Sequence, residues 1–422
     1  MIRTLVAGTT LLLATSTAAP AQEGAGERQS LLEARRGFQT KLVRTQRDAE
    51  ELTPPPAELF SLIRYRSPAG DLAAYVSRPP GPGKHPAIVW ITGGFPPGGI
   101  GESAWEPSDP ENDQSAKAYR EAGLIMMYPT LRGSFGNPGR QETFFGEVDD
   151  VIAAGRHLAT VEGVDPERIY LGGHSTGGTL ALLVAAAPQR FRAVFAFGPV
   201  ADPVGYGAEA LTYDPEDARE AGLRAPIRHL AAIRTPTYVI EGTVDANLDS
   251  LRALEGANQG TALRFFAVEG AGHFDVLAPV NRLIARRLAQ LDAATPLPLS
   301  AADVQAAFDD QRRAQREASD LEVLARARAG GASLETAQRA RYYLLCRERA
   351  PLVAASKAAG RLGFQLTGIE EHQDRSGGTY FVLTAGRTLV LGDLKAVFAA
   401  SRALAEVAAG QPGVAYSGWS AE

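Results

Sequence analysis

The chain has few of the residues that build disulfides, metal sites and basic surfaces. One cysteine in 422 residues, Cys346, excludes an intramolecular disulfide, and we interpret it as a core residue. No cluster of histidine, cysteine, aspartate or glutamate has metal-ligand spacing and no phosphate loop occurs, so we expect no cofactor and no metal. Lys plus Arg number 43 against 48 Asp plus Glu, and this net charge of −5 offers no basic stripe for nucleic acid.

Long apolar runs are also absent, so no membrane span is expected. The N-terminus has Arg3, an apolar run over residues 5–14 and Ala19-Pro20-Ala21, which together are typical of a secretory signal peptide over residues 1–21. We therefore predict an exported, secreted or periplasmic protein.

The length suggests two domains. Residues 22–56 are polar, and we expect a short helix over 29–52 followed by the stiff boundary Pro54-Pro55-Pro56. Apolar strand-like segments then alternate with helical ones, which predicts a doubly wound, mostly parallel α/β domain over residues 57–295 with an antiparallel hairpin at its edge. The expected strands are 63–65, 72–76, 87–91, 124–128, 169–171, 193–197, 237–240 and 263–268, and the main helices are 148–158, 178–187 and 280–291.

A second, smaller domain follows the motif Pro296-Leu297-Pro298. Residues 296–340 are rich in Ala, Arg, Glu and Gln and are expected to form a helical linker. Residues 341–422 show the β-α-β-β-α-β order of an α+β ferredoxin-like unit. Its expected strands are 341–346, 364–370, 379–383 and 414–419, and its expected helices are 352–362 and 394–409.

The strongest motif is Gly173-His174-Ser175-Thr176-Gly177, a match to G-x-S-x-G. A short apolar strand precedes it and a helical stretch follows it, which is the context of a nucleophile elbow. The glycines permit the strained turn that lifts the serine Oγ above the sheet edge. Ser175 is therefore the predicted nucleophile of an α/β-hydrolase.

An elbow serine needs a histidine base and a carboxylate, in the chain order Ser, Asp/Glu, His. Of six histidines only His273, in a glycine-flexed loop after a strand, has the right position. The others precede the serine, lie in the elbow, precede the acid's strand or fall in the second domain: His85, His157, His174, His229 and His372. Asp245, just past the strand 238–240, is the predicted acid, with Asp249 as the fallback and Asp202 less favoured.

Acyl transfer also needs two donors for the oxyanion. The Thr176 backbone N–H, at the start of the helix, is one. The second is expected from the glycine-rich loop after the strand 87–91, where the Thr92 hydroxyl or the Gly94 or Phe95 amide could serve.

These segments resemble the catalytic domain of the prolyl oligopeptidase family of serine hydrolases. The resemblance covers about residues 62–291, and it implies Ser175, Asp245 and His273 as nucleophile, acid and base. Family members often carry an N-terminal β-propeller, whereas here only short loops, chiefly 202–223 with Tyr206 and Tyr213, would shape access. The segments that carry the resemblance are 172–178, 131–136, 147–151 and 235–242.

Residues 341–422 are similar to the ribonuclease E regulator family of type B, on Tyr342-Tyr343 and Tyr416-Ser417-Gly418-Trp419. That family usually has an acidic residue where Ser417 stands. An exported protein would not reach a cytoplasmic ribonuclease, so we favour an accessory module for a protein partner or a homo-oligomer.

Together these features predict an exported serine hydrolase acting on a small peptide or ester substrate through an acyl-enzyme. The alternative is a non-catalytic protein that binds a partner through its C-terminal module.

Overall fold

The computed structural model describes residues 29–45, 50–96, 98–99 and 101–421. The expected signal peptide, residues 1–21, lies outside these residues. Within them, no helix combines the length and apolarity needed to cross a bilayer.

The larger domain is built on one eight-stranded sheet in the order β1-β2-β4-β3-β5-β6-β7-β8. Strands β4, β3, β5, β6, β7 and β8 are parallel, and the hairpin β1–β2 adds an antiparallel edge next to β4. This arrangement confirms the predicted α/β-hydrolase sheet. The strands are β1 (Phe60–Ser67), β2 (Gly70–Ser77), β3 (His85–Ile91), β4 (Ile125–Pro129), β5 (Val164–His174), β6 (Val194–Phe197), β7 (Thr237–Gly242) and β8 (Leu263–Val268).

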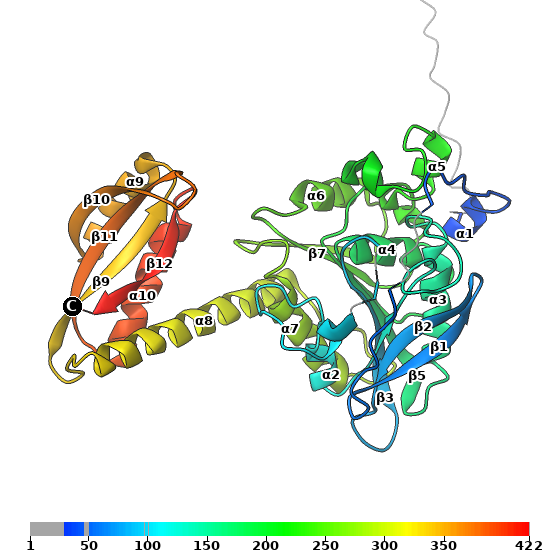
Figure 1. The fold of residues 1–422 in the computed structure, drawn as a ribbon, viewed down its shortest axis with the longest axis horizontal. Coiled ribbons are helices and arrows are strands. Elements are labelled where there is room, and N and C mark those ends of the chain that lie inside the picture. Colours follow the sequence, from blue (N-terminus) through cyan, green and yellow to red (C-terminus); the bar gives the residue numbers. More distant parts are fainter. Residues whose placement is uncertain (1–28, 46–49, 97, 100, 422) are drawn as a thin grey trace, which may run out of the picture.

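Helices cover both faces of this sheet (Figure 1). One core contains side chains of α3 (Glu147–Leu158), α4 (Thr176–Ala185) and α6 (Leu248–Ala257). The other contains those of α2 (Ala118–Glu121), α7 (Leu277–Gln290) and the start of α8 (Ala301–Ala329). Because both faces are covered, the central strand β3 is apolar and buried from Pro86 to Ile91. The long connection after β6 carries the short helix α5 (Ala218–Gly222).

The smaller domain has an antiparallel sheet in the order β10-β11-β9-β12. Two helices pack on one face of it, so the predicted ferredoxin-like β-α-β-β-α-β order is confirmed. Cys346 is buried in this core, as expected. The elements are β9 (Ala337–Cys346), α9 (Arg349–Arg361), β10 (Gln365–Gln373), β11 (Thr379–Val390), α10 (Leu394–Ala409) and β12 (Ala415–Ala421).

The segment predicted as a linker, residues 296–340, belongs partly to both domains. Its helix α8 packs Val304 and Phe308 into the large domain's core. At its other end, Val323 and Leu324 lie in the small domain's core. Since 29 residues of helix span about 43 Å, α8 reaches from one body to the other, as Figure 1 shows. The second domain therefore begins inside α8 rather than at residue 341.

The predicted N-terminal helix over 29–52 is wrong. Among the described residues of this range, the only helix is α1 (Leu31–Ala34). An extended stretch follows it, in which Leu42 bridges Tyr213. The backbone N–H groups of this stretch find partners on the large domain, for example Val43 N on Thr212 O. These long-range bonds replace the i→i−4 bonds that a helix would have made.

Candidate active site

Ser175 occupies the sharp turn between β5 and α4, with φ 55° and ψ −116°. This strained backbone is that of a nucleophile elbow, as predicted. Two glycines allow it: a Cβ on Gly177 would lie 2.2 Å from Ile91 O, and one on Gly173 would lie 2.5 Å from Gly177 O. The elbow thus packs too tightly for any side chain at these positions.

His273 lies on the loop after β8, with its ring 14% exposed. Its Nδ1 is 2.9 Å from Oε2 of Glu241, which is fully buried at the end of β7. The same carboxylate accepts the backbone N–H groups of Gly242 and Asn247, at 2.7 and 3.0 Å. Glu241 is therefore held rigidly and fixes the orientation of the imidazole. No direct hydrogen bond joins Ser175 to His273 in the described chain, and catalytic hydrogen bonds of this kind often tighten only when substrate binds.

The carboxylate partner of His273 was predicted to be Asp245, and the structure corrects this to Glu241. Asp245 is exposed at φ 45°, and within the described residues no hydrogen bond or ion pair connects it to His273. The loop folds back so that Asn247 N bonds Glu241, which leaves Asp245 at the outside of the turn. The alternatives also lie elsewhere: Asp249 is exposed in the first turn of α6, and Asp202 caps the 3₁₀ turn Pro203–Tyr206.

The residues predicted to supply the oxyanion donors lie on α4 and on the glycine-rich loop after β3, and one hydrogen bond joins these two elements. The Thr176 N–H, in the first residue of α4, has no intrahelical acceptor. The Thr176 hydroxyl donates to Gly94 O at 2.5 Å, and this hydrogen bond holds the glycine-rich loop next to the start of α4. The Thr92 hydroxyl instead donates to Gly99 O at 3.1 Å, within its own loop. The Thr92 hydroxyl proton is thus engaged within the loop, which leaves the amides of Gly94 and Phe95 as the candidates for the second donor.

An aromatic wall stands next to the serine. The ring of Tyr206 meets Phe95 edge-on at 5.1 Å and stacks on Phe144 at 6.1 Å. Its hydroxyl lies 3.2 Å from Thr179 Oγ1. The pKa of Tyr206 is raised to about 12 because the effect of burial exceeds that of the hydrogen bonds with Thr179 and Ser175, which lower it. Tyr206, expected only to shape access, thus also contacts the nucleophile.

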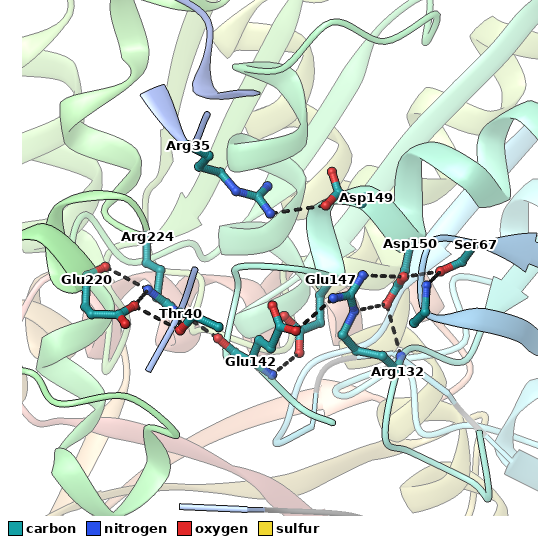
Figure 2. Close-up of polar contacts among 11 residues, drawn as sticks. Arg35, Thr40, Ser67, Arg132, Glu142, Glu147, Asp149, Asp150, Glu220 and Arg224 are labelled. Carbon is teal, nitrogen blue, oxygen red and sulfur yellow. Dashed lines mark hydrogen bonds and ion pairs between the residues drawn. The ribbon is translucent and has the colours of Figure 1, made fainter. Parts of the chain in front are cut away.

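A network of charged side chains contacts Phe145, which directly follows Phe144 of this wall. Figure 2 shows the polar contacts of this network. The network joins the N-terminal segment to the loop before α3 and to the connection around α5. Arg35 pairs with Asp149 at 3.2 Å and lies over the ring of Phe145, next to Phe144 in sequence. Arg224 pairs with Glu220 at 2.5 Å and donates to Thr40 Oγ1 at 2.6 Å. The N-terminal segment is therefore part of the structure around the site.

One member of this network makes stability depend on pH. Glu147 is buried; burial raises its pKa from 4.5 to about 7, against the attraction of Arg132. Between these values the folded protein holds a proton that the unfolded chain has lost, so its free energy of unfolding falls as pH rises. We expect the free energy of unfolding of Glu147→Gln to match that of the wild type near pH 5 and to exceed it at pH 8, by up to about 3 kcal/mol. An equal difference at both pH values, measured by thermal denaturation, would contradict this.

Sequence reasoning missed Glu241, although a signal was present. A glutamate at the end of the otherwise apolar strand Thr237–Gly242 must be buried with the rest of that strand. Buried carboxylates need partners, which points to a histidine or arginine nearby.

Family comparisons match parts of both domains. The sequence model of the prolyl oligopeptidase family matches residues 110–291, and that of regulator of ribonuclease activity B matches residues 317–421. The second match begins within α8, at residue 317. This start lies just before Val323 and Leu324, the α8 side chains in the small domain's core.

Individual relatives are more distant. The chain is 28% identical to 2,6-dihydropseudooxynicotine hydrolase of Paenarthrobacter nicotinovorans over 233 residues, 50% of this chain and 58% of that protein. It is 23% identical to the uncharacterized peptidase YtmA of Bacillus subtilis (strain 168) over 215 residues, 46% and 77% of the two chains. The crystal structure of puromycin hydrolase is similar with a TM-score of 0.45 and 18% identity, covering 58% of this chain and 42% of that one. The chain is therefore similar to the prolyl oligopeptidase family over residues 110–291 and to the regulator of ribonuclease activity B family over residues 317–421.

Proposed function

We propose that the protein is an exported serine hydrolase that works through an acyl-enzyme. Ser175 Oγ attacks the substrate carbonyl while His273 Nε2 takes its proton and later gives it to the leaving group. Glu241 keeps the other ring proton on Nδ1, so that Nε2 is free to act as the base. The N–H of Thr176, with that of Gly94 or Phe95, holds the oxyanion.

The observation that carries this proposal is the contact of 2.9 Å between His273 Nδ1 and the buried Glu241, beside a serine held in a strained elbow. A serine, a base and an orienting carboxylate brought together from three separate segments are the parts that acyl transfer requires. The hydrolase and peptidase names of the relatives support the same class.

The rim of the site supports an apolar substrate. Four large apolar side chains are exposed on loops at the carboxyl edge of the parallel strands: Phe95, Val204, Val244 and Phe274. Exposed apolar side chains gathered around a site favour apolar ligand groups. We therefore infer esters or short peptides with bulky apolar acyl groups as substrates.

We assign the smaller domain an accessory, partner-binding role. It has its own core and meets the larger domain through α8. A non-catalytic protein acting through this domain alone is the competing hypothesis, and the paired Glu241 and His273 argue against it. Export rests on the signal-like N-terminus and is tested by cell fractionation of the tagged full chain.

The decisive test is labelling with a fluorophosphonate probe, which reacts with activated serines. We expect the wild type to be labelled and Ser175→Ala not to be, with Ser61→Ala, a serine on the edge strand β1, as the control that keeps labelling. A folded wild type that resists the probe would overturn the proposal. A panel of p-nitrophenyl esters and peptide anilides would then separate esterase from peptidase activity.

A further inference from the structure

A fully buried histidine, which the proposed chemistry does not use, directly precedes the nucleophile. The ring of His174 lies 4.5 Å from that of His273, centroid to centroid. Its Nε2 is 2.9 Å from the backbone carbonyl oxygen of His273. On the other side, its Nδ1 is 2.9 Å from Gln114 Nε2 and 3.1 Å from Gln114 Oε1.

The partners fix which ring nitrogen carries the proton. The His273 carbonyl can only accept, so His174 Nε2 must donate. Burial, together with repulsion from His273, lowers the pKa of His174 to about 3, so the ring is neutral at working pH. Its Nδ1 is then an acceptor and pairs with the NH2 group of Gln114.

The remaining amide atom of Gln114 completes the chain of bonds. Gln114 Oε1 accepts the Gly93 N–H at 3.4 Å, in the glycine-rich loop that carries the expected oxyanion donor. Gln114 itself is anchored because Trp90 Nε1 donates to its carbonyl at 2.9 Å. Every donor in this chain thus meets an acceptor, from the oxyanion loop through the elbow to the base loop.

We propose that Gln114 and His174 are positioning residues that hold the oxyanion loop, the elbow and the His273 loop in register. This inference rests on the proposed function, because the three loops matter together only if Ser175 and His273 react. Neither side chain is assigned contact with substrate. Their effect is on the placement of groups that do the chemistry, where an error of about 1 Å can cost roughly a hundredfold in rate.

Variants at both positions test the relay by their rate of fluorophosphonate labelling and by kcat and KM on a p-nitrophenyl ester. His174→Phe keeps a buried ring but removes both hydrogen bonds, and we expect the labelling rate and kcat to fall by about 10- to 100-fold with KM little changed. His174→Gln keeps one donor and one acceptor and should retain activity to within about fivefold. Gln114→Leu, at a half-buried position, should lose about tenfold.

His157→Gln, a half-buried histidine on α3, is the matched control and should behave as the wild type. If His174→Phe fails to fold, the labelling rate and kcat of Gln114→Leu test the proposal instead. Folded variants at both positions with wild-type rates would overturn the relay.

A second readout does not need activity. In Ser175→Ala protein with ¹⁵N-labelled histidine, NMR should show His174 neutral with its proton on Nε2 from pH 5 to 8, and Gln114→Leu should shift the ring signals of His273. A proton on Nδ1, or a His273 signal insensitive to Gln114→Leu, would overturn the relay. Correct tautomers in Ser175→Ala, together with a folded wild type that the probe never labels, would instead refute the proposed function.

Discussion

Replacing Glu241 by glutamine is expected to lower kcat/KM by about a thousand- to ten-thousand-fold, as happens when the carboxylate of a serine protease triad becomes an amide. The Glu241 carboxylate accepts three hydrogen bonds, from His273 Nδ1 and from the N–H groups of Gly242 and Asn247. An amide offers one oxygen in place of two, so one of these donors must face an NH2 group. If that donor is the imidazole, its proton moves to Nε2 and the ring can no longer accept from Ser175.

Asp245→Asn is the matched control, because it neutralises an exposed carboxylate four residues further along the same loop. We expect it to change kcat/KM by less than about threefold, as a solvated charge outside the triad should. The measurement is steady-state hydrolysis of an activated ester, with thermal denaturation to show that each variant is folded. Loss of activity in Asp245→Asn with Glu241→Gln unaffected would mean that the loop rearranges and that Asp245 is the acid.

Asp150→Ala is expected to lower the free energy of unfolding by about 3–5 kcal/mol, because it leaves a buried guanidinium without its main partner. Asp150 is fully buried and accepts from Arg132 Nε at 2.9 Å, Nη2 at 3.0 Å and the backbone N at 3.1 Å. Ser67 donates to it as well. Arg132 would keep only Glu142, at 3.0 Å.

The buried pair of Asp150 and Arg132 can be compared with an arginine–aspartate ion pair on the surface. Arg66 and Asp71 lie 3.2 Å apart with side chains 78% and 58% exposed. Asp71→Ala should therefore cost less than about 1 kcal/mol. Urea denaturation measures both. A loss in Asp150→Ala no larger than that in Asp71→Ala would show that the buried network does not hold the loop before α3.

Local chemistry made much of the fold predictable. Continuous apolar runs identified the strands of the large sheet, because strands covered on both faces carry no polar alternation. The elbow at Ser175 was predictable from the G-x-S-x-G motif, because only glycine fits at positions 173 and 177. Helix α10 (Leu394–Ala409) was predicted to the residue, since an amphipathic repeat ends there at Gly410.

Two expectations failed where distant partners decided the outcome. The N-terminal segment has helix-forming residues, yet it runs extended because Lys41 N and Val43 N bond Glu220 and Thr212. The segment after residue 296 was read as a spacer, but apolar side chains at each end of α8 enter two different cores. Neither set of contacts can be predicted from local sequence, because each joins segments that are far apart in the chain.

The sequence by itself identified the candidate nucleophile, the candidate base and the order of the elements, since each follows from a short motif or from hydrophobic periodicity. Only the tertiary structure decided which carboxylate faces His273 and which groups tie the three loops together. Asp245 and Glu241 lie in one short segment, and the choice between them depends on how the turn folds against Asn247. Gln114 is 60 residues from His174, so their contact exists only once β3, β5 and the chain before α2 have packed.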